Sequence, residues 1–241
     1  MIKDFLSIVI PCKNEENYIK RTLEEISLQF GIRSTRVIIA DGGSTDSTLL
    51  KIDEFIKSED NNLKIEVIEG GAVSVGRNRG AGLVKTPFIL FLDADITFTD
   101  LAAIDISSNE LKENTNLELI GTTPEYMGEA DLAASLIFSF NRLTTRIMSM
   151  IDPFAIGAFM LISREKFVEL GGFDEMVHQS EDWLLSRQIK SKNFKLIPNL
   201  ITQDNRRFKK FGYIKMLMMV MKNWFNRGDK KHFYKDQKYW K

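Results

Sequence analysis

The chain has 241 residues, of which 44% are apolar and 27% are charged, and its formal net charge is zero. These proportions are those of a globular protein and exclude a disordered one. The single cysteine, Cys12, excludes an intramolecular disulfide and a cysteine-cluster zinc site, and no apolar run is long enough to predict a transmembrane helix.

Strand-like and helix-like segments alternate through the first half of the chain. Short apolar runs predict strands over residues 6–10, 37–40, 65–68, 88–92 and 117–122. Apolar residues spaced three and four apart predict helices over residues 16–30, 47–57, 75–84 and 101–112. The side chains expected to face inward from the second of these helices are Leu49, Leu50, Ile52, Phe55 and Ile56. This alternation predicts an α/β fold, Rossmann-like, with a mainly parallel sheet flanked by helices and ligands at the carboxyl ends of the strands.

The second half of the chain has a different pattern. A long amphipathic helix is expected over residues 130–151, a strand over 158–162 and a helix over 181–192. No internal repeat and no linker rich in Pro, Gly or Ser separates these segments. We therefore expect one domain over residues 1–210, followed by an extension over residues 211–241.

The most informative motif is Asp93-Ala94-Asp95, which follows the apolar run Phe88–Leu92. Burying unpaired carboxylates costs several kcal/mol, so a buried strand that ends in two acids favours a site at that end. Mg²⁺ and Mn²⁺ take oxygen ligands and are commonly shared with substrate phosphates. The alternative is a solvated loop after the strand.

Polar residues also follow the first two expected strands. Asn14 and Glu15 come after the first, and the loop Asp41–Thr48 comes after the second. A tight turn and a helix cap by Ser44 or Asp46 explain most of this loop. They do not explain Asp41 at the strand end, where an acid is placed to accept hydrogen bonds from a base or a ribose.

Two later motifs each permit a structural and a functional interpretation. In the segment Gly76–Gly82, Arg77 and Arg79 either face a diphosphate or form a solvated basic surface, and Gly80 and Gly82 would allow close packing on the sheet. In the segment Ser180–Asp182, the serine either caps a helix whose first turn is acidic, or one carboxylate is a general base.

Taken in order, these motifs resemble family 2 glycosyltransferases with the GT-A fold, over roughly residues 5–210. The residues that carry the resemblance are Ser7–Pro11, Asn14-Glu15, Asp41–Asp46, Arg77-Asn78-x-Gly80, Asp93-Ala94-Asp95, Gly171–Asp174 and Glu181-Asp182.

The resemblance implies a nucleotide-diphosphate sugar donor, a divalent cation (Mn²⁺ or Mg²⁺) and inversion at the anomeric carbon. By the same resemblance, the nucleoside pocket would be lined by Pro11, Asn14 and Glu15. Asp41 would contact the base, Arg77 the nucleotide, and Asp93 the ribose and the metal. Asp95 would ligate the metal, and Asp182 would be the general base. Many family members supply a histidine to the metal, but neither His178 nor His232 clearly matches that position, and Gln203-Asp204 stands near it instead.

The carboxyl-terminal extension is strongly basic. Residues 205–241 hold 12 lysines and arginines and two acids, whereas residues 1–204 hold 21 and 31. A segment that resembles one branch of the family, Arg206-Arg207-Phe208 with Gly212, precedes an amphipathic helical stripe. This stripe either packs on the domain as core or lies on a membrane with its lysines on anionic lipid. Because the extension is rich in methionine rather than in polar base-reading residues, no nucleic acid is expected.

We therefore expect a metal-dependent, inverting glycosyltransferase that acts on a saccharide or lipid-linked acceptor, in the cytoplasm or peripherally on the cytoplasmic membrane face. Two alternatives remain open. A nucleotidyltransferase also uses paired acids and metal, although no glycine-rich triphosphate loop follows the first strand. A non-catalytic nucleotide-sugar binding module would need the pocket, but it would not need Asp182.

Overall fold

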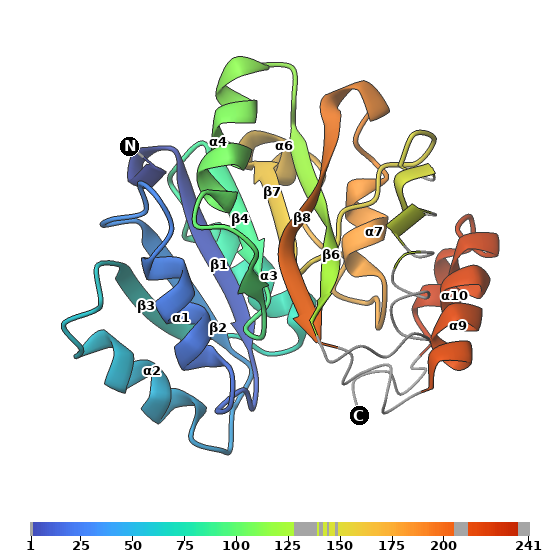
Figure 1. Cartoon of the computed structure of the whole chain (residues 1–241). Helices are drawn as coiled ribbons and strands as arrows, with labels where there is room; N and C mark the ends of the chain where they lie inside the picture. Colours follow the sequence, from blue (N-terminus) through green and yellow to red (C-terminus); the bar gives the residue numbers. More distant parts are fainter. Residues whose placement is uncertain are drawn as a thin grey trace.

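A computed structural model describes residues 2–127, 139, 142–143, 145–147, 149–204 and 212–235. It has an eight-stranded sheet in the order β3-β2-β1-β4-β7-β6-β8-β5, with helices on both faces (Figure 1). The expected α/β architecture with a mainly parallel sheet is confirmed.

The amino-terminal half is a parallel sheet with helical crossovers. Its strands are β1 (Leu6–Cys12), β2 (Arg36–Asp41), β3 (Lys64–Glu69) and β4 (Phe88–Leu92). A short 3₁₀ helix, η1 (Ile2–Asp4), precedes them, and they are linked by α1 (Ile19–Ser27), α2 (Thr48–Ile56) and α3 (Val73–Gly82). Because β2 and β4 both run parallel to β1, the loops that follow these three strands lie along one edge of the sheet.

The later half of the chain adds strands that pair in both parallel and antiparallel directions. Its elements are β5 (Thr97–Phe98), α4 (Ala103–Glu113), β6 (Leu119–Met127), β7 (Phe159–Ser163), α6 (Arg164–Glu169), α7 (Glu181–Ser186), η2 (Ser191–Asn193) and β8 (Phe194–Asp204). Strand β7 runs antiparallel to β4, with Phe159 opposite Leu92. The start of β7 therefore lies at the carboxyl end of β4. Within the part of the chain that the structure describes, no helix is long and apolar enough to cross a membrane.

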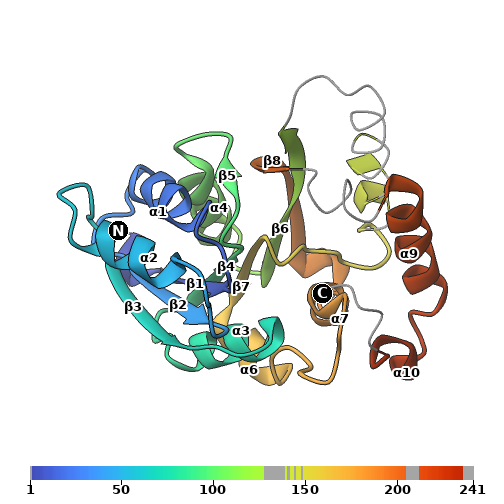
Figure 2. The same cartoon turned by 90° about the horizontal axis from the view of Figure 1, so that it is seen from below.

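The sheet separates two hydrophobic cores, because alternate residues of each central strand face opposite sides. Ile8 and Leu90 face a core that is covered by α1, α2 and α4. Val9 and Phe91 face a second core, to which α3, α6 and α7 contribute. Figure 2 shows these two groups of helices on opposite faces of the sheet. Burial on both faces explains why the central strands are continuously apolar.

Several expected details were wrong. Ile52 and Phe55 of α2 are buried, but Leu49, Leu50 and Ile56 are exposed, because only one narrow face of this nine-residue helix reaches the sheet. The helices expected over 16–30 and 181–192 are shorter, at Ile19–Ser27 and Glu181–Ser186. Most of the helix expected over 130–151 lies outside the described residues.

The carboxyl-terminal extension contains α9 (Tyr213–Phe225) and α10 (Lys230–Phe233). Both helices lie at the margin of the molecule near α7 (Figures 1 and 2). Phe233 is fully buried, whereas Met218, Met221 and Phe225 are exposed. The expected boundary at residue 210 and the segment Arg206–Phe208 lie outside the described residues.

Candidate active site

Hydrogen bonds that involve the side chains of Asn14, Ser44 and Thr48 join the loop after β1 to the loop after β2. Asn14 Oδ1 accepts a hydrogen bond from the Thr45 N–H at 2.8 Å, and Asn14 N–H donates to Ser44 Oγ at 2.9 Å. The Glu15 N–H donates to Thr48 Oγ1 at 2.7 Å. The side chain of Asp41 closes its own loop, since it accepts a bond from Ser44 Oγ at 2.5 Å.

Acidic groups surround this edge of the sheet. Burial raises the pKa of the Cys12 thiol at the end of β1, and the nearby carboxylates of Glu15, Asp41, Asp46 and Asp95 raise it further. Pro11 is partly buried one residue earlier, opposite Ala40 of β2. The edge therefore has a negative potential, which favours a cation.

Asp93 and Asp95 follow β4 at the same edge. Asp93 Oδ1 accepts a hydrogen bond from Arg77 Nη2 at 2.8 Å, and Asp95 is buried. Among the described residues, no group of three or more His, Cys, Asp and Glu side chains is arranged to hold a metal. Two carboxylates nevertheless suit Mg²⁺ or Mn²⁺, because Mg²⁺ is usually held by one or two carboxylates together with water and substrate phosphates.

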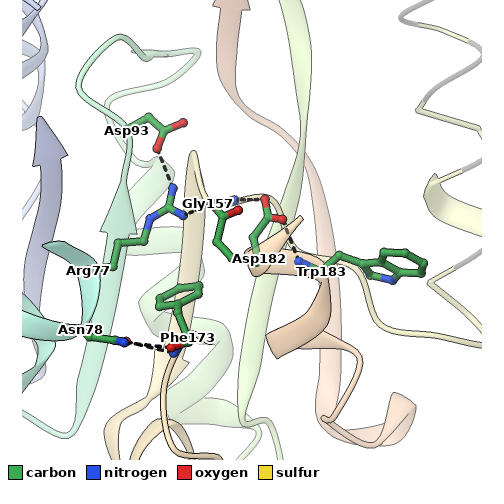
Figure 3. A network of polar contacts seen from close by, with 8 residues as sticks. Arg77, Asn78, Asp93, Gly157, Phe173, Asp182 and Trp183 are labelled. Carbon is green, nitrogen blue, oxygen red and sulfur yellow. Dashed lines mark hydrogen bonds and ion pairs between the residues drawn. The ribbon is translucent and has the colours of Figure 1, made fainter. Parts of the chain in front are cut away.

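Arg77 is the centre of a buried ionic network (Figure 3). It is only 2% exposed, and its Nη2 contacts Asp93 while its Nη1 donates to Glu181 Oε1 at 2.8 Å. Its guanidinium carbon also lies 5.4 Å from the centre of the Phe173 ring. Arg77 therefore links the end of β4 to the start of α7. A contact between Arg77 and a nucleotide stays a prediction, but the guanidinium already holds two protein carboxylates.

Gly157 leaves the space in which this guanidinium lies. A Cβ atom at residue 157 would stand 2.2 Å from Arg77 Nη2, closer than real Cβ atoms approach other heavy atoms. The Gly157 N–H also donates to Asp182 Oδ2 at 2.8 Å. The segment before β7 is thus in contact with both Arg77 and Asp182, and any larger side chain at this position would displace the guanidinium.

The neighbouring residue Asn78 fastens the Gly171–Asp174 motif to α3. Its Oδ1 accepts a hydrogen bond from the Phe173 N–H, and its Nδ2 donates to the Phe173 carbonyl, each at 2.9 Å (Figure 3). Gly80 packs against β1 as expected, since a Cβ there would lie 2.5 Å from Val9 Cγ1. The same expectation for Gly82 was wrong, because no atom of another element lies within 4 Å of a Cβ at that position. Arg79 is exposed and contacts Glu69.

Asp182 lies in the first turn of α7, with its carboxylate directed toward the sheet. Its Oδ1 accepts a hydrogen bond from the Trp183 N–H at 2.7 Å, in addition to the bond from Gly157 (Figure 3). Burial raises the pKa of Asp182 from 3.8 to about 6, and the adjacent Glu181 carboxylate adds to the rise, while Arg77 and the two N–H donors oppose it. A carboxylate with a pKa near neutrality suits a general base.

The structure brings the predicted residues into two groups. Asn14, Glu15 and Asp41 form one at the β1–β2 end, and Arg77, Asp93 and Asp182 form the other around the guanidinium. The Arg77–Glu181 pair and the role of Gly157 were not predicted from the sequence. The pair joins residues 104 positions apart, so no local pattern marks it. His232 lies in α10, where its Nε2 contacts Asn223 Oδ1, and the side chains of Gln203 and Asp204 are outside the described residues.

The fold is that of the GT-A glycosyltransferases. The model of the family described as glycosyl transferase family 2 matches residues 7–171, and the chain belongs to this family.

Curated relatives and solved structures agree with this assignment. The minor teichoic acid biosynthesis protein GgaA of Bacillus subtilis is 28% identical over 195 residues, which cover 77% of this chain and 43% of GgaA. The succinoglycan biosynthesis protein ExoA of Rhizobium meliloti is 26% identical over 200 residues, which cover 78% of this chain and 59% of ExoA. The chain thus spans about half the length of these relatives.

Two solved structures show the likeness in fold. TarS 1–349 of S. aureus, in complex with UDP-GlcNAc, has a TM-score of 0.63 at 17% identity and covers 84% of this chain and 59% of its own. The mannosyltransferase PcManGT of Pyrobaculum calidifontis, in complex with GDP-Man and Mn²⁺, has a TM-score of 0.65 at 17% identity and covers 90% of this chain and 64% of its own.

Proposed function

We propose that this chain transfers a sugar, with inversion, from a nucleoside-diphosphate sugar to an acceptor hydroxyl, and that Asp182 is the general base. The nucleoside would lie over Pro11, Asn14, Glu15 and Asp41. The observation that carries this proposal is the Arg77 network, in which one buried guanidinium joins the end of β4 to the turn that holds Asp182. The diphosphate side and the acceptor side of a displacement reaction would thereby be held in a fixed relation.

Asp93 and Asp95 would hold the divalent cation together with the diphosphate oxygens. A bound cation would supply charge neutralisation for the departing diphosphate. Asp182, with its pKa near 6, would take the proton of the acceptor hydroxyl as that oxygen attacks the anomeric carbon. The hydrogen bonds from the Gly157 and Trp183 amides hold the carboxylate in one orientation. A single displacement removes one proton from the acceptor, so it needs only one base.

The proposal is tested by the release of nucleoside diphosphate from UDP-GlcNAc, UDP-glucose and GDP-mannose, with Mn²⁺ or Mg²⁺ and without an acceptor. One donor should be hydrolysed by the unmodified protein, and Asp182→Asn should lower this rate at least ~100-fold while donor affinity is retained. If Asp182→Asn lowered donor affinity and left the rate at saturating donor unchanged, Asp182 would be a binding residue and the proposed mechanism would be wrong.

The acceptor we propose is a saccharide or a lipid-linked glycan. The support is that GgaA is a teichoic acid biosynthesis protein and ExoA a succinoglycan biosynthesis protein. We also propose peripheral contact with an anionic membrane through α9. The support is that Met218, Met221 and Phe225 are exposed on a helix that also carries the exposed Lys215 and Lys222. Apolar side chains beside lysines are typical of helices that lie at a lipid surface.

Sedimentation with phosphatidylglycerol vesicles tests the membrane contact. The full chain should pellet at low salt, and less of it should pellet as salt screens the attraction. The triple variant Met218→Ser, Met221→Ser and Phe225→Ser should stay in the supernatant. The matched control, Leu49→Ser with Leu50→Ser on α2, removes exposed apolar residues elsewhere and should still pellet. Equal pelleting of both variants would exclude α9 as the contact.

A further inference from the structure

The two carboxyl-terminal helices pack against the segment that leads into α7. Phe233 of α10 is fully buried with Val177 and Trp183, and the rings of Phe233 and Trp183 meet edge to face at 6.2 Å. The Phe233 carbonyl accepts a hydrogen bond from the His178 N–H at 3.1 Å. Trp183 directly follows Asp182, so the docked helices contact the chain on both sides of the proposed base.

A buried polar cluster, the Asn223 cluster, joins α9 to the same segment. Its members are Gln179, Ser180, Asn223 and His232. Asn223 is 4% exposed, and its Oδ1 accepts hydrogen bonds from Gln179 Nε2 at 3.3 Å and from His232 Nε2 at 2.9 Å. Its Nδ2 donates to Ser180 Oγ at 3.0 Å. One side chain of α9 therefore satisfies three polar groups, two of them directly before α7 and one in α10, and buried polar groups that lose their partners are costly.

Ser180 is the point at which this cluster acts on the backbone. It has φ 59°, in the left-handed region that residues other than glycine adopt infrequently, and it directly precedes Glu181 and Asp182. The turn at Ser180 sets the direction in which the first turn of α7 leaves, and this first turn carries Asp182. An anchor on the Ser180 side chain opposes relaxation of the strained backbone to another conformation.

We infer that Asn223 is a positioning residue, which holds Ser180 and thereby orients Asp182 toward the acceptor hydroxyl. The helices α9 and α10 are then part of the active site of the transferase, although they come after all of the family motifs in the chain. This inference rests on the proposed role of Asp182. It also gives the two faces of α9 different tasks, since Asn223 is buried on one face while Met218 and Met221 are exposed on another.

The test replaces Asn223 by leucine, which is similar in size and cannot form these hydrogen bonds. The matched control is Asn226→Leu, because the Asn226 side chain, just past the end of α9, donates to the Lys222 carbonyl and has no hydrogen bond to the segment before α7 among the described residues. Two measurements are made on the full chain: hydrogen exchange of the Gly157 and Trp183 amides, and hydrolysis of UDP-GlcNAc or GDP-mannose with Mn²⁺. Exchange reports the bonds to Asp182 directly and needs no substrate.

Asn223→Leu should speed exchange at both amides and lower kcat by at least about tenfold with donor affinity unchanged, since a 1 Å misplacement of a catalytic group costs roughly 100-fold. Asn223→Asp keeps the two accepted bonds and lets the Ser180 hydroxyl donate, so it should restore both signals. Ser180→Ala is a milder change, which can be used if Asn223→Leu fails to fold, and it should reproduce the effects. The losses from the two changes should not add in the double variant.

Two outcomes separate this inference from the proposed function. If Asp182→Asn retained the hydrolysis rate, the proposed base would be wrong, and with it the role of Asn223. If Asp182→Asn abolished hydrolysis while Asn223→Leu and Ser180→Ala matched Asn226→Leu in rate and exchange, the proposed function would stand and the positioning role would be overturned.

Discussion

Replacement of Arg77 by methionine is the most informative single change to the buried network. The methionine side chain would occupy similar buried space but carries no charge, so Asp93 and Glu181 would lose their shared cation. The side chain of Glu181 is 6% exposed and that of Asp93 is 17% exposed, so solvent replaces little of the lost attraction. Removing one partner of a buried ion pair costs about 3–5 kcal/mol. For a domain of this size the melting temperature should fall by roughly 6–20 °C.

Urea unfolding followed by circular dichroism measures the effect, because a change in midpoint at constant slope reports stability. The matched control is Arg79→Met on the same helix. The Arg79 side chain is 49% exposed and its partner Glu69 is 91% exposed, so the expected loss is about 0–1 kcal/mol. Arg77→Lys should fall between the two variants, since an ammonium keeps the charge but cannot reach both carboxylates as a planar fork does.

Equal losses of stability in Arg77→Met and Arg79→Met would contradict the expected contribution of the buried network. Such a result would mean that desolvation of the three charged groups cancels their attraction, and that the network contributes nothing to the fold. The same variants also bear on activity. Because Arg77 lowers the pKa of Asp182, its removal should move the acid limb of the pH–rate profile to higher pH.

Three further predictions concern the same site. Gly157→Ala should lower the free energy of unfolding by about 1–3 kcal/mol, because the new Cβ overlaps Arg77. The control Gly82→Ala should not destabilise the protein, because the new Cβ has open space and alanine has the better helix propensity. Equal effects of the two changes on the urea midpoint would count against the overlap. The folded-state pKa of Asp182, about 6, lies above the unfolded 3.8, so its contribution to stability is present at low pH and is lost as pH rises from about 4 to 6. Relative to Asp182→Asn, the unmodified protein should therefore gain up to about 3 kcal/mol between pH 7 and pH 4, and parallel stability curves would contradict the raised pKa. Binding of a nucleoside diphosphate should require Mn²⁺ or Mg²⁺, and Asp95→Ala should abolish that dependence in calorimetry; equal affinity of the unmodified protein with and without Mn²⁺ would remove the cation from the mechanism.

The sequence predicted the central strands well because their requirements are local. The run Phe88–Leu92 is apolar throughout because both of its faces are covered, and β4 has the same bounds. Strand β8 was missed because Pro198 and Asn199, the latter with φ 59°, interrupt any alternating pattern. Strand β5 has only two residues and leaves too little pattern to recognise.

The candidate site likewise has features that are visible in the sequence and features that are not. Acids at the ends of apolar strands are visible in the sequence, and the structure places Asp41, Asp93 and Asp95 at the expected edge. The partners of these residues are not visible, because Arg77 and Glu181 are 104 positions apart in the chain and only the tertiary fold brings them together. The inward face of α2 was overestimated because periodicity does not show how much of a short helix the sheet will cover.

The pairing of β4 with β7 has a consequence for the order in which the molecule forms during synthesis. Strands β1 to β4 are contiguous in the chain and are joined by short crossovers, so they can assemble as soon as they leave the ribosome. Closure of the later half must bring Phe159 back to Leu92, a contact distant in sequence and hence slow to form. Until that closure, β4 is an unpaired strand edge in the nascent chain, and the carboxylate of Glu181 is not yet held by Arg77. The amino-terminal half would therefore be the first to need protection from aggregation, and its nucleotide-side loops would form well before a complete transferase exists.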